Sequence, residues 1–235
     1  MGAHPTIEQM LERQARLQEL RDRAAEQGGA EARRALAHRD EGPWISISKQ
    51  AGTGGLEIAQ SLAAELGWQA FDREILTAIA EHTERREVVL SRFDERAIGA
   101  FDDYVGQLLV PGDPGRFAYW RELVRTIWAL ARRGNVVLVG RGAHWILKRE
   151  FGLSVRLVAP AEFRSAEVAR AGGLTLPAAR RQMEREDLQQ AHFVRKVFGR
   201  AVDDPEGYDL MLNVATLGPS ATVRTIGDAL RHKLA

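Results

Sequence analysis

The sequence has no cysteine, few lysines and no long apolar run, and each of these shortages excludes a class of protein. Without cysteine, none of the 235 residues can form a disulfide, a zinc ribbon or a thiol nucleophile. The six histidines are scattered, and no pair has the helical spacing of a shared metal ion. No apolar run approaches the ~18 residues of a membrane span, and charged residues begin at Glu8, where a signal peptide would be apolar. We therefore expect a cytoplasmic protein that has no membrane partner.

Charge is nearly balanced over the whole chain but is unevenly distributed along it. The 33 basic and 32 acidic residues leave a net charge of +1. Residues 141–200 nevertheless contain 12 basic and 6 acidic side chains, and most of the basic ones are arginines. Local positive charge of this kind favours a compact anionic ligand and argues against nucleic acid, which needs a wider basic surface. A solvated, arginine-rich helical face explains the same surplus equally well.

The N-terminal part of the chain differs from the rest. Residues 6–38 predict a helix, because apolar side chains from Ile7 to Ala24 recur at helical spacing and Pro43 closes the segment. We therefore divide the chain into an N-terminal helical arm, residues 1–42, and a domain, residues 43–235. Three alternatives remain open for the arm. It forms a homodimer through its helix, it packs as a clasp on its own domain, or it is a mostly solvated tail.

From Trp44 onward, predicted strands alternate with predicted helices. The strands are expected at residues 44–47, 68–71, 135–139, 154–158 and 209–214. The helices are expected at residues 55–66, 73–82, 86–96, 117–132, 160–171 and 219–234, with a helical hairpin or one long helix at 176–199 and a loop at 110–115. The run Asn-Val-Val-Leu-Val at 135–139 is typical of a strand buried on both faces. This alternation predicts an α/β fold with a parallel sheet.

A glycine-rich turn, residues 48–55, lies between the first strand and the first helix of the domain. Free backbone N–H groups at such a helix start favour an anion, most often a phosphate. The phosphate-loop motif reads G-x-x-x-x-G-K-[ST]. In that register Gly55 replaces the lysine and Leu56 replaces the hydroxyl, so the loop is degenerate. Lys49 offers a positive charge from the other end of the turn, and a tight turn without a ligand is the alternative interpretation.

Six ordered blocks resemble the cytidylate kinase-like family, which is related to the nucleoside monophosphate kinases. The blocks are residues 45–59, 66–76, 135–147, 154–164, 185–199 and 203–213. The resemblance covers about residues 44 to 234 and leaves the N-terminal arm outside. It implies a P-loop NTPase three-layer fold, with a five-stranded parallel sheet flanked by helices and a helical lid. It also implies transfer of the γ-phosphate of ATP to a nucleoside monophosphate such as CMP or dCMP, with Mg²⁺.

The resemblance also assigns roles to single residues. The donor phosphates would be held by the N–H groups of Gly52, Thr53, Gly54 and Gly55. The transferred phosphate would be neutralised by Lys49, Arg141, Arg185 and Arg195. The acceptor would be bound by Asp72, Arg141 and Asp187. Two positions depart from the family pattern, because Gly142 replaces an acidic residue that helps to recognise cytosine and Gln190 replaces a lid arginine.

Plainer roles exist for several of these side chains. Asp72 is placed to cap the helix that begins at Arg73. The arginines at 185 and 195 fit a solvated helical face. Asp187 has no basic residue three or four positions away, so local pairing does not explain it. The degenerate loop therefore leaves a second function open, a catalytically impaired nucleotide-binding regulatory protein that assembles through its N-terminal helix.

Overall fold

A single parallel sheet organises the domain. The computed structural model describes residues 6–7, 9–12, 16, 43–82, 114–147 and 149–234. Its strands are β1 (Trp44–Lys49), β2 (Gln69–Phe71), β3 (Val136–Val139), β4 (Gly152–Val158) and β5 (Leu210–Asn213). All neighbouring pairs are parallel, in the order β2-β3-β1-β4-β5. This confirms the predicted five-stranded sheet and the P-loop NTPase fold class.

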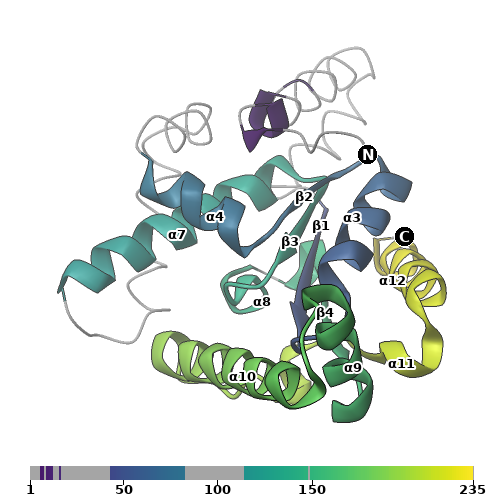
Figure 1. Cartoon of the computed structure of the whole chain (residues 1–235). Coiled ribbons are helices and arrows are strands. Elements are labelled where there is room, and N and C mark those ends of the chain that lie inside the picture. Colours follow the sequence, from purple (N-terminus) through teal and green to yellow (C-terminus); the bar gives the residue numbers. More distant parts are fainter. Residues whose placement is uncertain are drawn as a thin grey trace, which may run out of the picture.

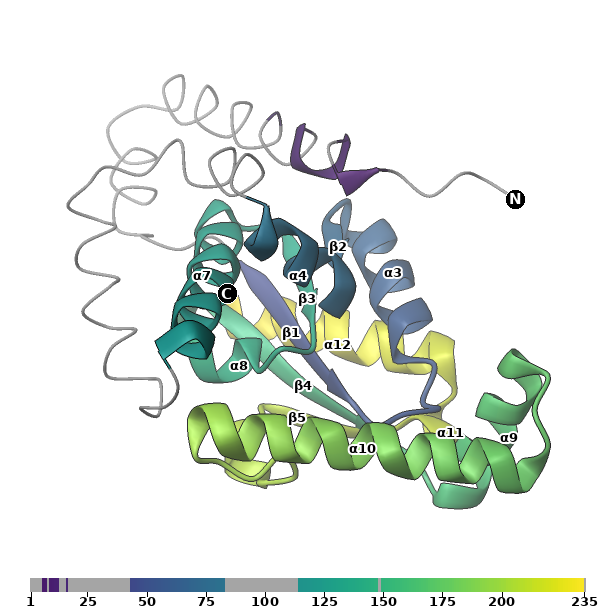
Figure 2. The same ribbon diagram turned by 60° about the vertical axis from the view of Figure 1, so that its left-hand side comes forward.

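Helices cover both faces of the sheet and one of its ends (Figures 1 and 2). One face is covered by α3 (Gly55–Leu66) and α12 (Pro219–Leu234), and the other by α4 (Arg73–Glu81), α7 (Pro114–Arg133) and α8 (Ala143–Ile146). The short α11 (Val214–Leu217) follows β5. The remaining pair, α9 (Ala161–Gly172) and α10 (Leu176–Phe198), lies beyond the carboxyl ends of the strands. None of the described helices is both long and apolar enough to cross a membrane.

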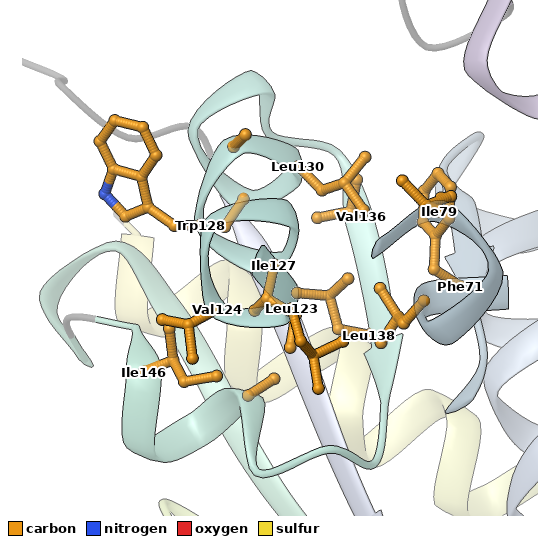
Figure 3. Close-up of a cluster of buried hydrophobic side chains, with 14 of the residues drawn as sticks. Phe71, Ile79, Leu123, Val124, Ile127, Trp128, Leu130, Val136, Leu138 and Ile146 are labelled. Carbon is orange, nitrogen blue, oxygen red and sulfur yellow. The ribbon is translucent and has the colours of Figure 1, made fainter. Parts of the chain in front are cut away.

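Two hydrophobic clusters fill the space between the layers. Residues alternate across β1, so Trp44 packs toward α4 and α7 while Ile45 and Ile47 pack toward α3 and α12. Figure 3 shows the first cluster, in which Leu123 and Ile127 of α7 face β3. Every residue of β3 is buried, as its apolar run predicts. The glycine-rich turn, Asp72 and Arg141 follow the ends of β1, β2 and β3, where the hydrophobic core stops.

The start of the N-terminal arm packs on its own domain. Thr6 and Gln9 form a reciprocal cap, in which each backbone N–H donates to the other side chain at 2.9 and 3.2 Å. Met10 and Leu11 are buried in the cluster with α4 and α7. For this first turn the contacts favour the clasp among the three alternatives. The rest of the predicted arm helix lies largely outside the described residues.

Most predicted element boundaries agree with the structure to within a few residues. The clearest difference is α7, which begins at Pro114 inside the segment expected to be a loop. Proline is compatible with the first turn of a helix, because its missing N–H has no intrahelical partner there. The helix predicted at residues 86–96 lies outside the described residues.

Candidate functional site

The glycine-rich turn connects β1 to α3 through a shaped backbone loop. Gly52 and Gly54 adopt left-handed conformations with φ of 79° and 63°, which glycine adopts without strain. Inside the loop, the Thr53 hydroxyl donates to the Gln50 carbonyl at 2.8 Å. Gly54 is the N-cap of α3 and supplies no side-chain cap. The first N–H groups of α3 thus lack a side-chain acceptor and suit an anion.

Side chains from α9 and α10 fix this loop. Asp187 of α10 accepts the Ala51 N–H at 2.8 Å and forms an ion pair with Arg164 of α9 at 2.6 Å. The same guanidinium donates to the Ala51 and Ala159 carbonyls at 3.1 and 3.0 Å. A Cβ added to Gly52 would overlap the backbone carbonyl of Arg164. The loop is therefore held on both sides by the two helices beyond the sheet.

The stem of Lys49 lies where the side chain of residue 55 would begin. A Cβ on Gly55 would stand 2.7 Å from Cδ and 3.0 Å from Cβ of Lys49. Among the described residues, the Lys49 ammonium has neither an ion pair nor a hydrogen-bond partner. The space beside position 55 holds one lysine side chain. Because Lys49 fills it, residue 55 must be a glycine.

Two cavities are lined by residues of the loop. The larger, about 700 Å³, is lined by the loop, α3, α9 and the start of α12. The smaller, about 360 Å³, is lined by the start of α4, by the turn after β3 and by α10. Lys49 and Leu56 line both cavities. We call these two shared residues the junction of the cavities, and of the two only Lys49 is charged.

Arg141 belongs to a tight turn at the end of β3. Its own φ is 53°, and Gly140 and Gly142 on either side are at 80° and 68°. A left-handed arginine is strained backbone, a feature that concentrates at functional sites. A Cβ on Gly142 would overlap the ring of Phe198. The packing of α10 therefore explains why no acidic side chain stands at position 142.

The Arg141 side chain lines the smaller cavity. Its Nη2 donates to the Thr77 hydroxyl at 2.7 Å, and its guanidinium lies 5.8 Å from the Phe193 ring centre. Nε is buried without a partner, and burial lowers the pKa of Arg141. No carboxylate of the described residues pairs with it. An anion in this cavity would satisfy the guanidinium.

The two predicted acidic residues also line the smaller cavity, and each has a structural contact. Asp72 caps α4 by accepting the N–H groups of Glu74 and Ile75 at 2.9 and 2.8 Å, so its capping role is confirmed. Asp187 pairs with Arg164, a partner that sequence spacing does not reveal. The binding roles of both carboxylates remain predictions.

The two remaining predicted arginines lie outside both cavities. Arg185 is exposed and borders a separate shallow groove on α10 with Arg181 and His192. Arg195 is exposed near the end of the same helix. The structure therefore brings Lys49, Asp72, Arg141 and Asp187 together and leaves these two arginines apart. Their catalytic roles remain predictions.

Two buried arginines near the loop escaped the sequence reasoning. Arg156 interrupts the apolar pattern of β4, and this charge within a buried strand was the available signal. Arg164 gave no such signal, because its partner Asp187 is 23 residues away along the chain. Both are at least nine-tenths buried.

We expect a buried histidine of α8 to make stability depend on pH. His144 packs 4.6 Å from the Tyr208 ring, and burial, with Arg156 and Arg149, lowers its pKa to about 3. The unfolded chain binds this proton near pH 6.5, so the contribution of His144 is lost as pH falls below that value. We expect the free energy of unfolding to fall between pH 7 and 5 by about 2 kcal/mol more in the wild type than in His144→Phe.

Urea denaturation at both pH values tests this expectation. The exposed His232, exchanged for asparagine, is the matched control and should keep the pH dependence of the wild type. Equal pH dependence in His144→Phe and the wild type would contradict it.

Comparison with known proteins gives a consistent result. The sequence model of the Cytidylate kinase-like family matches residues 44–216. A cytidylate kinase from Ignicoccus hospitalis is 29% identical over 184 residues, which cover 77% of this chain and 95% of that protein. One from Halobacterium salinarum is 27% identical over 188 residues, covering 79% and 88%. The solved structure of an uncharacterized protein from Eubacterium ventriosum has the same fold, with a TM-score of 0.58 at 21% identity over 79% of this chain and 98% of that one.

Proposed function

This chain belongs to the cytidylate kinase-like family, and on that premise we propose that it transfers the γ-phosphate of ATP to a nucleoside monophosphate, CMP or dCMP in the first place. One observation carries the proposal. Two cavities are lined by residues of the glycine-rich loop, and Lys49 is the charged residue that lines both. Phosphoryl transfer needs two sites in line and positive charge at the point where they meet.

The larger cavity suits the donor and the smaller one suits the acceptor. In the larger, the open N–H groups of α3 and the left-handed Gly52 and Gly54 form a backbone cradle for the phosphates of ATP. In the smaller, Arg141 has no ion-pair partner among the described residues and would bind the acceptor phosphate, and Asp72, which lines the same cavity, would bind its sugar or base. Lys49 then neutralises the charge that develops during transfer.

Magnesium fits this arrangement as a companion of ATP. Within the described ranges, no group of three His, Cys, Asp or Glu side chains is placed to hold a metal ion. Leu56 offers no oxygen where a hydroxyl ligand is usual. Because Mg²⁺ retains several waters and accepts phosphate oxygens as ligands, we infer that it is held mainly by ATP and water. When bound, it would neutralise charge on the phosphates.

A second candidate function is nucleotide binding without useful turnover. The observation that favours it is the substitution of both side-chain contributions of the phosphate-loop motif, at Gly55 and Leu56. In that case nucleotides raise the melting temperature without forming product. The cradle and Arg141 would serve binding alone.

Product detection separates the two functions. The purified protein is incubated with ATP, Mg²⁺ and each common nucleoside monophosphate, and the products are resolved by chromatography. We expect the diphosphate of CMP or dCMP to form. In Arg141→Ala, the KM for the acceptor should rise about tenfold or more, since a charge-assisted bond to its phosphate is lost. Nucleotide-induced stabilisation without any product would favour the regulatory alternative. The absence of both stabilisation and product would contradict both functions.

A further inference from the structure

A buried arginine, Arg156, contacts a residue that lines the smaller cavity. Arg156 is 3% exposed and lies near the carboxyl end of β4, in register with Ser48 of β1. The next residue of β1 is Lys49, at the junction of the two cavities. Arg156 therefore lies on the strand beside the junction residue and contacts Gln190 of α10.

The contacts of this guanidinium are all neutral. Nη1 donates to the Ser48 hydroxyl at 2.7 Å and to Oε1 of Gln190 at 3.3 Å, while Nε is buried without a partner. No carboxylate in the described part of the chain lies within ion-pairing distance of it. Arginine keeps its charge in proteins, so Arg156 is a buried cation with no ion-pair partner among the described residues. Such a charge is costly unless an anion approaches it.

Gln190 is the link between this cation and the cavity. It lines the smaller cavity while its amide bonds inward, to Arg156 and, at 3.5 Å, to Ser48. Both bonds are long, and both partners of the guanidinium are neutral. A phosphate oxygen would form a shorter and stronger bond with Arg156 than the amide does.

The charge balance of the cavity wall also calls for another cation. Its lining has three basic side chains and four acidic ones. The basic residues are Lys49, Arg73 and Arg141, and the acidic residues are Asp72, Glu74, Glu186 and Asp187. Arg164, which pairs with Asp187, makes this set electrically neutral, so the charge of an entering phosphate dianion needs a further cation such as Arg156.

We propose that Arg156 is a further phosphate-binding residue of the acceptor cavity, held by Gln190 and Ser48 while the cavity is empty and released by Gln190 to the phosphate of the bound nucleotide. The proposal rests on the proposed function, because it assumes that the smaller cavity receives a nucleoside monophosphate. It assigns Arg156 to the phosphate and not to the base.

Calorimetric titration with CMP and with cytidine tests the assignment, since the two probes differ by the phosphate. The wild type should bind CMP more tightly than cytidine. In Arg156→Met, the affinity for CMP should fall about tenfold or more, and the affinity for cytidine should stay unchanged. Arg180→Met is the matched control, because Arg180 is exposed and paired with Glu184 away from both cavities.

A second pair of variants keeps Arg156 in place, in case its removal prevents folding. Gln190→Glu sets a carboxylate on the guanidinium, whereas Gln189→Glu adds the same charge to the same cavity wall without an Arg156 contact. We expect Gln190→Glu to weaken CMP binding about tenfold more than Gln189→Glu does. Equal losses in the two variants, or an unchanged preference for CMP in a folded Arg156→Met protein, would overturn the proposal alone. A wild type that does not prefer CMP over cytidine would overturn the proposed function and this inference with it.

Discussion

Replacing Lys49 by methionine is expected to lower kcat for phosphoryl transfer about a hundredfold or more, with little change in stability. Methionine keeps the length of the stem that packs over Gly55 and removes the ammonium between the cavities. The charge lost is the one that acts on the transferred phosphate, so the KM values for ATP and CMP should change less than kcat. Steady-state kinetics with both substrates, together with the melting temperature, measure this.

Variants at Gly55 test whether activity depends on the position of the Lys49 ammonium as well as on its presence. Gly55→Ala retains Lys49 but sets a Cβ 2.7 Å from its Cδ, so the lysine must shift and turnover should fall. In the double variant Lys49→Gly and Gly55→Lys, the stem leaves and the charge returns from the usual motif position, so part of the lost activity should return. The exposed Lys196, changed to methionine, is the control for a general loss of basic charge. Unchanged turnover in Lys49→Met would exclude the assigned role.

The fold was predictable because local patterns determine it. The apolar run of β3 reflects burial on both faces of the sheet, and the helical spacing of apolar residues in α3 reflects burial of one helix face, so each can be recognised within a single segment. The start of α7 was not predicted, since Pro114 and Gly115 are turn formers in isolation and also tolerated in a first helical turn. The conformational preferences of these two residues therefore allowed either a loop or a helix start at residue 114.

The site was predictable only where one motif contains it. The glycine turn predicts an anion site from its own residues, whereas Arg141 and Asp72 were assigned from the family resemblance. The contacts that shape the site connect distant segments, and no spacing rule reveals them. Asp187 meets Ala51 across 136 residues, and Gly142 is required by Phe198, which belongs to another helix.

Exchanging Gly52 for alanine is expected to remove nucleotide binding and to lower the free energy of unfolding by about 2–4 kcal/mol. Two costs add at this position. The φ of 79° disfavours any side chain, and the new Cβ would overlap the backbone of Arg164, which cannot move aside as a flexible side chain can. Relief requires the loop to move away from α9, and that movement breaks the bonds of Arg164 and Asp187 to Ala51.

Gly67→Ala separates backbone strain from the collision at Gly52. Gly67 ends α3 with a φ of 69°, and a Cβ there would meet nothing within 4 Å. This control should therefore cost about 1 kcal/mol, the strain alone, and should leave the ATP-induced rise in melting temperature intact. Urea denaturation and thermal shift with ATP measure both effects in both variants. If Gly52→Ala costs no more than Gly67→Ala and still responds to ATP, the contact between the loop and α9 does not shape the phosphate site, and the cradle must be formed by α3 alone.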